Sequence, residues 1–109
     1  MTQITWKESC GCVSVRLQGH ADFARQGERD LVCAGISMLV CTLSACLETQ
    51  EARGLVRLQC RKVAPGDVAF QIAILTRAEE VRAMLDTILT GFQLLQERYP
   101  ENVDVKMNA

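Results

Sequence analysis

Residues 31–47, LVCAGISMLVCTLSACL, contain no charged side chain. Their content of Ala, Leu, Met, Val, Ser and Cys is typical of a helix, and the lack of charge predicts that this helix is buried nearly all round. Asp30 directly precedes the stretch. It is the expected N-cap, because its carboxylate can accept hydrogen bonds from the first free backbone amides.

Alternating apolar and polar residues before this stretch predict a β-hairpin. Residues 12–18 have the period of a half-buried strand, and an earlier strand is expected over residues 2–7. Residues 8–11 join the two strands, and Gly11 permits the positive φ that such a turn needs.

A second hairpin is predicted after the uncharged stretch. Residues 56–61 and residues 68–74 alternate in the same way. Residues 64–67, which contain a proline followed by a glycine, supply the turn between them.

The remainder of the chain predicts a helix and a short strand. Thr76 and Glu79 have the spacing of a capping box, which opens an amphipathic helix that Pro100 ends. Residues 103–107 then alternate as a terminal strand. We expect a single domain over residues 1–109 with an α+β fold: two layers, a mostly antiparallel sheet of about five strands and two helices, in the order β-β-α-β-β-α-β.

Composition limits the classes of function. The chain has 109 residues, of which 49% are hydrophobic, so it supports one core. A formal net charge of -1 shows no electrostatic footprint for a polyanion, and direct nucleic-acid binding is therefore disfavoured. We identify no unbroken apolar run long enough to cross a membrane and no leader segment, so we expect a soluble, cytoplasmic protein without a membrane partner.

The cysteines are expected to be reduced, because no secretory signal accompanies them. All except Cys33 are interpreted as small apolar packing residues: Cys10, Cys12, Cys41, Cys46 and Cys60. A second closely spaced cysteine pair is missing from the sequence, and His20 is its single histidine. We therefore expect neither a metal site nor a cofactor.

Cys33 and His20 are the candidates for chemistry. The charged segment 19–30 predicts a polar loop, which places Cys33 in the first turn of the following helix, where unpaired amides favour a thiolate. His20 lies at the other end of this loop, so the loop can fold back and bring imidazole to thiol. The alternative is a surface histidine beside an inert cysteine, and the residues by themselves leave both open.

The segments around these two residues read Gly19-His20-Ala21, then Gly27 and Asp30, and Val32-Cys33-Ala34-Gly35-Ile36-Ser37. They resemble the signature of the ribosomal-processing cysteine protease family, Prp. The predicted order of strands and helices resembles the small α+β fold of that family along most of the chain.

The resemblance implies a cysteine endopeptidase with Cys33 as thiolate nucleophile and His20 as general base. It implies a substrate, the precursor of large-subunit ribosomal protein L-twenty-seven, from which an N-terminal extension is removed after a hydrophobic, aromatic-containing sequence. It also implies a homodimer, for which the uncharged helix is the expected interface.

Other residues of the motif have weaker assignments. Gly19 and Gly27 predict a loop that becomes ordered when substrate binds. Either Asp22 or Asp30 is the candidate for orienting the imidazole, although the helix N-cap is an equally good role for Asp30.

Free amides around Cys33 and Ala34 are candidate donors to an oxyanion, since a helix N-terminus presents amides without intrahelical acceptors. Gly35 either keeps that turn open or packs against the sheet. Ser37, one turn beyond the cysteine, either bonds locally or lines the site.

Two further hypotheses come from other classes of protein. The first is a non-catalytic, ribosome-associated peptide-binding module in which the polar loop docks a basic peptide and Cys33 only packs. The second is a thiol redox protein, which is disfavoured because the Cys-x-x-Cys spacing is missing.

Overall fold

The computed structural model describes the backbone of residues 1–19 and 26–108, and the side chains of residues 1–19 and 31–108. The elements follow the predicted order, and the α+β prediction is confirmed. They are β1 (Thr2–Ser9), β2 (Cys12–Gln18), α1 (Gln26–Ala52), β3 (Val56–Ala64), β4 (Asp67–Ile74), α2 (Ala78–Arg98) and β5 (Val103–Met107).

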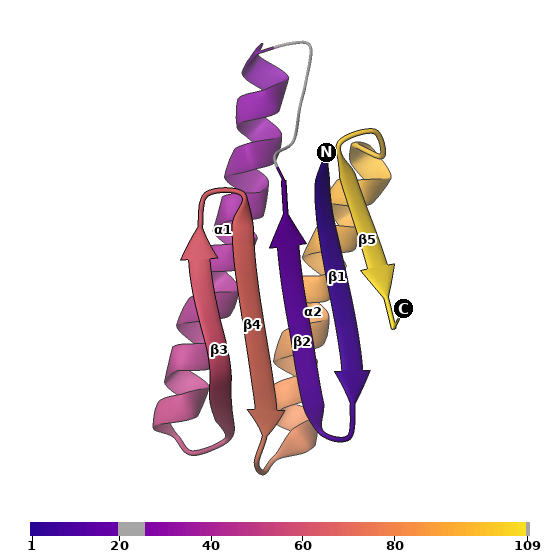
Figure 1. Ribbon diagram of the computed structural model, residues 1–109. Coiled ribbons are helices and arrows are strands. Elements are labelled where there is room, and N and C mark those ends of the chain that lie inside the picture. Colours follow the sequence, from indigo (N-terminus) through magenta and orange to yellow (C-terminus); the bar gives the residue numbers. More distant parts are fainter. Residues whose placement is uncertain (20–25, 109) are drawn as a thin grey trace.

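The five strands form one sheet in the order β3-β4-β2-β1-β5 (Figure 1). Neighbouring strands run antiparallel, except that β5 lies parallel to β1, so the sheet is mixed but mostly antiparallel, as predicted. A parallel neighbour requires a crossover rather than a tight turn. Here α2 carries the chain from β4, past β2 and β1, to β5 at the edge of the sheet.

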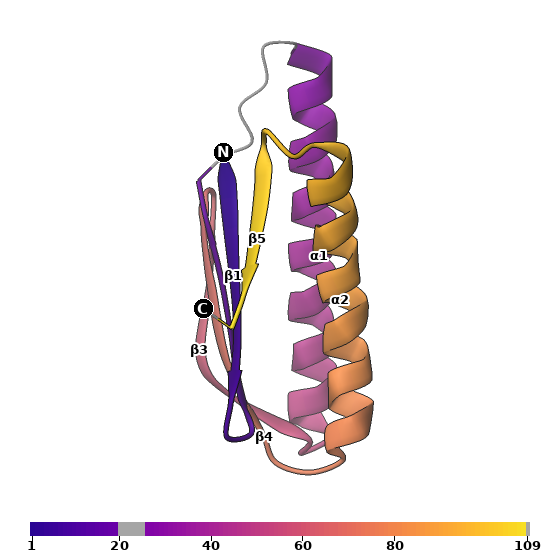
Figure 2. The ribbon, with the colours of Figure 1, turned by 90° about the vertical axis from the view of Figure 1, so that its right-hand side faces the viewer.

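Both helices lie on the same face of the sheet, which gives two layers (Figure 2). The strands alternate, so one face supplies the core while the other faces solvent. The inward side chains of β1 and β2 are buried, and α2 buries the stripe that its helical spacing predicts. The main buried residues of these three elements are Ile4, Trp6, Val13, Val15, Leu17, Val81, Leu85, Ile88, Leu89 and Phe92.

Helix α1 begins five residues earlier than Leu31, the first residue of the uncharged stretch. Gly27 and Asp30 therefore lie within the helix rather than in a loop, and the prediction that Asp30 is the N-cap is wrong. The charges of residues 28–30 predict a loop. Two of these residues, Glu28 and Asp30, are acidic, and acidic residues are favourable in the first turns of a helix because of its dipole.

The outer face of α1 is exposed, so the prediction of a helix buried nearly all round is also wrong. Leu31 is 61% exposed and Met38 is 67% exposed. The segment Leu31–Ala52 is apolar and long enough to cross a membrane by composition, and 33% of its most apolar window is buried inside the protein. The cause is the two-layer architecture, because a helix on an open sheet has one face on the core and one face away from it.

The start of α2 also differs from the prediction. Arg77 is the N-cap, with φ 50° and ψ 49°, and no side chain caps the helix, so the capping box of Thr76 and Glu79 does not form. The amides of Leu75 and Thr76 instead donate to the carbonyl oxygen of Leu55, at 2.8 and 3.3 Å. These bonds hold the segment before α2 against the start of β3.

Candidate active site

A cavity of about 360 Å³ lies between the N-terminal half of α1 and the sheet. It is lined by residues from α1, from the β3–β4 hairpin and from the outer ends of β1 and β2: Thr2, Leu17, Gly19, Cys33, Ile36, Ser37, Val40, Cys41, Val63, Ala64, Pro65, Gly66 and Val68. Most of these residues are apolar. The cavity therefore suits the apolar side chains of a ligand.

Helix α1 presents Cys33, Ser37 and Cys41 to this cavity. Residues four apart in a helix lie on one face, so these three residues form one row along the cavity wall. Cys33 is partly buried and packs against the hydrophobic core. Cys33 is thus held in place by packing and still lines the cavity.

Gly19 closes the same cavity from the end of β2. Its φ is 91°, and a Cβ atom at this position would lie 2.4 Å from the backbone oxygen of Met1. Its amide donates to the carbonyl oxygen of Gly66 over 2.9 Å, which ties the end of β2 to the turn between β3 and β4. Only glycine fits this close approach, and His20 follows it directly in the chain.

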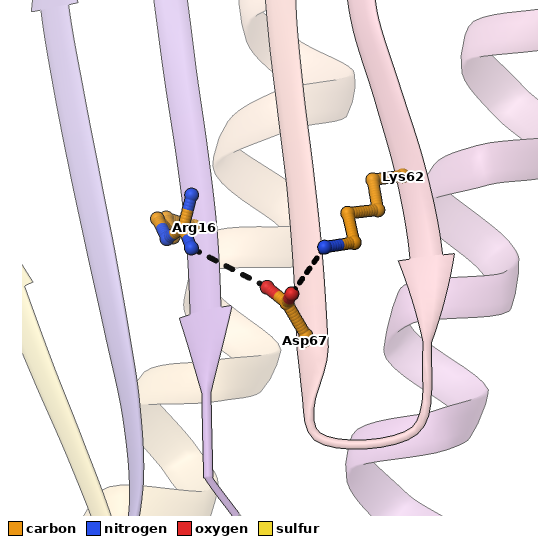
Figure 3. Close-up of polar contacts among 3 residues, drawn as sticks. All are labelled: Arg16, Lys62 and Asp67. Carbon is orange, nitrogen blue, oxygen red and sulfur yellow. Dashed lines mark hydrogen bonds and ion pairs between the residues drawn. The ribbon is translucent and has the colours of Figure 1, made fainter.

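The β3–β4 hairpin forms the opposite wall. Pro65 and Gly66 make its turn, and the positive φ of 70° at Gly66 matches a type II turn with proline at the second position. Asp67 at the base of this turn pairs with Lys62 and, over 3.4 Å, with Arg16 (Figure 3). The hydrogen bond from Lys62, helped by the positive charges of Lys62 and Arg16, holds the pKa of Asp67 below its ordinary value of 3.8.

The structure brings only some of the predicted site residues together. Cys33 and Ser37 line the cavity. Ala34, by contrast, is exposed. His20 and Asp22 lie outside the described residues, as does most of the segment between β2 and α1, so the predicted pairing with Cys33 and the substrate-ordered loop stay predictions.

The predicted oxyanion donors are not where the sequence placed them. Because α1 begins at Gln26, the amides of Cys33 and Ala34 lie in the interior of the helix. There a backbone amide donates to the carbonyl oxygen four residues earlier. The free amides of this helix belong to its first turn, so the prediction that those of Cys33 and Ala34 are free is wrong.

Gly35 has a packing role, but against α2 rather than against the sheet. A Cβ atom on Gly35 would lie 3.3 Å from Cδ2 of Leu95. On the facing helix, a Cβ atom on Gly91 would lie 2.5 Å from Cδ2 of Leu39. The two glycines let the helices approach each other closely, on the side of α1 away from the cavity.

Sequence reasoning missed most of the cavity wall. Cys41 was interpreted as a packing residue, although its separation of eight residues from Cys33 places both on one helical face. The wall formed by Val63, Pro65 and Val68 carries no signal in the sequence, because nothing local shows which hairpin lies beside α1. The packing interpretation was also wrong for Cys10 and Cys12, since both are exposed.

Comparisons with known proteins agree with this fold. The model of the family described as cysteine protease Prp matches residues 1–104. SMU.848 from Streptococcus mutans is 31% identical to this chain, with 98% of this chain and 93% of that chain covered and a TM-score of 0.67. A search of curated proteins found no match.

Two solved structures of the ribosomal processing protease Prp from S. aureus are also similar. The one with a covalently linked product peptide is 25% identical, with a TM-score of 0.70 over 98% of this chain and 99% of that chain. The one with a substrate peptide is 24% identical, with a TM-score of 0.69 over the same shares. Since the family match spans nearly the whole sequence, the chain belongs to the Prp family of cysteine proteases.

Proposed function

We propose that this protein is a cytoplasmic endopeptidase that removes the N-terminal extension of large-subunit ribosomal protein L-twenty-seven. In this proposal Cys33 is the nucleophile and His20 is the general base. One observation carries it: the motif cysteine is in the wall of a largely apolar cavity that is large enough for side chains of a peptide.

Two further observations support the assignment. Gly19, the residue before His20, lines the same cavity as Cys33. The related S. aureus enzyme has been solved with a covalently linked product peptide, as expected for a protease that forms an acyl-enzyme. An apolar cavity also fits a cleavage site that follows hydrophobic and aromatic residues.

The reaction proceeds by acyl transfer. His20 takes the thiol proton, and Sγ of Cys33 attacks the scissile carbonyl carbon to give a tetrahedral oxyanion. When this intermediate collapses, the C–N bond breaks and the imidazolium returns the proton to the leaving amine. His20 then takes a proton from water, and the hydroxide attacks the thioester to release the extension as a carboxylic acid and to regenerate the thiol.

The test uses the unmodified protein and the ribosomal protein L-twenty-seven precursor of the same organism, with intact masses as the readout. We expect loss of one defined N-terminal peptide. Cys33→Ala should abolish cleavage, and His20→Ala should lower the rate by at least about a hundredfold because the general base is lost. Cys46→Ala, on the same helix but outside the cavity, should retain full specific activity.

The outcomes separate the proposal from its main alternative. Tight binding of the precursor by both the unmodified protein and Cys33→Ala, without cleavage by either, would identify a peptide-binding module. Cleavage of other peptides but not of this precursor would support protease activity and would contradict the proposed substrate. An unchanged rate in His20→Ala would remove that residue from the mechanism.

We also propose that two copies associate through the outer face of the helix layer. Leu31 and Met38 of α1 and Leu94 of α2 are 61%, 67% and 57% exposed. Met38 and Leu94 line one shallow groove between the helices, together with Gly35 and Gly91. Arg98 of α2 also lines the groove, but no charged residue occurs in α1 between Leu31 and Leu47, so the α1 side of this surface is costly to leave in water.

The test of this interface is the oligomeric state in solution. Met38→Glu places a charge in the groove and should convert a dimer into a monomer in sedimentation experiments. Gln71→Glu, at an exposed position on the open face of the sheet, is the control for the added charge. A monomer at all concentrations for the unmodified protein would reject the proposed interface.

A further inference from the structure

Two exposed thiols flank Gly11 at the turn between β1 and β2. Cys10 and Gly11 are the central residues of this two-residue turn, with φ values of 51° and 76°, the pattern of a type I′ turn. Ser9 pairs directly with Cys12 across the turn. The turn lies at the end of the sheet opposite the β3–β4 turn (Figure 1), whose residues Pro65 and Gly66 line the cavity.

Ser9 contacts Cys10 and lies beside Cys12. The Ser9 hydroxyl donates a hydrogen bond to Sγ of Cys10 over 3.7 Å. Ser9 and Cys12 line one shallow hollow on the open face of the sheet, together with Lys7. Directly paired residues have Cβ atoms about 4.5–5.5 Å apart. The Cys10 sulfur thus accepts a hydrogen bond from Ser9, the residue that pairs with Cys12 across the turn.

The spacing of the two cysteines suits a disulfide. Disulfide-linked residues have Cα atoms about 4.4–6.8 Å apart. Cys10 and Cys12 are separated by two Cα–Cα steps of about 3.8 Å each, and a tight turn folds these steps to less than their extended sum. The positive φ of Cys10 is unusual for a residue other than glycine, asparagine or aspartate, so nothing in turn chemistry explains a cysteine here.

The backbone that carries the two thiols is fixed on both sides. The carbonyl oxygen of Gly11 accepts a hydrogen bond from the amide of Ile74 at 2.8 Å. The amide of Glu8 donates to Oδ1 of Asn108 at 3.1 Å, and the Glu8 carboxylate pairs with Arg82 at 2.8 Å. The backbone of the turn is therefore held in place, and two thiols two residues apart on a fixed turn act on each other at a high effective concentration.

Two other pairs of cysteines, Cys33 with Cys41 and Cys12 with Cys60, are too far apart for a disulfide. Cys33 and Cys41 lie eight residues apart on α1, about 12 Å along the helix axis. Cys60 on β3 aligns with a residue of β4, which separates it from β2 and Cys12 by two strand spacings of about 4.8 Å each. Both separations exceed the reach of a disulfide.

We propose that Cys10 and Cys12 form a reversible disulfide by exchange with a low-molecular-weight disulfide. One thiolate attacks the small disulfide, forms a mixed disulfide and releases one small thiol. The second cysteine attacks the protein sulfur of that mixed disulfide, closes the Cys10–Cys12 bond and releases the second small thiol. The protein loses two hydrogen atoms, and the small disulfide is reduced to two thiols. Solvent-accessible cysteines beside a resolving cysteine are typical of redox-responsive sites.

The test does not require protease activity. The full chain is incubated with excess oxidised glutathione, quenched with acid, labelled with N-ethylmaleimide and digested with trypsin. Cleavage after Lys7 and Arg16 gives a peptide of residues 8–16 that contains Cys10 and Cys12 and no other cysteine. The mass of this peptide distinguishes two labelled thiols, a mixed disulfide and an internal disulfide, whatever happens at Cys33.

We expect the internal disulfide to exceed the mixed disulfide by about tenfold or more, because the second thiol acts at an effective concentration in the millimolar range or above. Cys12→Ser should instead retain glutathione on Cys10, and Cys10→Ser should retain it on Cys12. Dithiothreitol should restore two labelled thiols. A peptide with one glutathione and one label, with two glutathiones, or with two labels after prolonged oxidation would overturn the proposal.

Discussion

Gly19 lies where β2 ends, and its backbone has φ 91° in close contact with the carbonyl oxygen of Met1. Two separate constraints therefore act at one residue. The positive φ disfavours any side chain, and the missing Cβ leaves room for the backbone of β1. Because Gly19 also lines the cavity and precedes His20, its conformation sets where the chain leaves the sheet beside Cys33.

Gly19→Ala should destabilise the protein more than Gly54→Ala. Gly54 also has a positive φ, of 76°, but a Cβ atom there would meet nothing within 4 Å. We expect Gly54→Ala to lower the free energy of unfolding by about 1–2 kcal/mol, from backbone strain alone. Gly19→Ala adds a clash with backbone, so its loss should be larger. Urea unfolding, followed by the fluorescence of the buried Trp6, measures both; equal losses would show that Met1 moves aside without cost.

At the scale of elements, α1 has several different environments around its circumference, besides its exposed outer face. Its inner face packs on the sheet, the row Cys33, Ser37 and Cys41 faces the cavity, and Gly35 approaches Leu95 of α2. A periodicity of 3.6 residues shows which residues share a face, but it does not show what each face meets. The neighbours come from β3, β4 and α2, which lie elsewhere in the sequence.

Cys41→Phe should block the cavity without removing the nucleophile. The larger side chain occupies space between α1 and the β3–β4 hairpin, so we expect kcat/KM for precursor cleavage to fall by at least about tenfold, which corresponds to about 1.4 kcal/mol. Cys33 should still react with a small alkylating reagent. Ala45→Phe, an exposed position one turn further along α1, is the control and should leave kcat/KM unchanged. A similar loss in both variants would mean that the cavity does not receive the substrate.

At the scale of the whole molecule, ion pairs connect strands that are distant in sequence. Asp67 joins β4 to Lys62 of β3 and to Arg16 of β2, across three neighbouring strands of the sheet (Figure 3). Arg53, which follows α1, pairs with Glu80 of α2 at 2.7 Å and lowers the pKa of that carboxyl. These groups couple the stability of the fold to pH.

Asp67→Asn should make the protein less sensitive to acid. The pKa of Asp67 is lower in the folded protein than its ordinary value of 3.8, so the carboxylate stabilises the fold above that value, and the contribution is lost as pH falls through the folded pKa. The asparagine variant lacks this contribution, so its urea midpoint should differ from that of the unmodified protein near neutral pH and converge with it in acid. Asp86→Asn, at an exposed position on α2, is the control. A constant difference down to about pH 2 would contradict the linkage.

Local patterns were sufficient for much of this protein. Alternation predicted the strands, the proline-glycine pair predicted the β3–β4 turn, and helical spacing together with Pro100 predicted the extent of α2. The residues around His20 and Cys33 indicated the family, because they are close together along the chain. Local signals failed at two helix starts. At the start of α1, charged residues predicted a loop where the helix already runs. At the start of α2, the amides of Leu75 and Thr76 donate to the carbonyl oxygen of Leu55, and the predicted capping box does not form.

The sequence by itself therefore determined the elements, their order and the family. The tertiary structure decided the position of β5 beside β1, the cavity wall opposite Cys33, and the packing of Gly35 against α2. The physical reason is that secondary structure follows from periodicities of two or 3.6 residues within one segment. A cavity wall or a strand neighbour depends instead on packing between segments that are distant along the chain, and no local pattern records that packing.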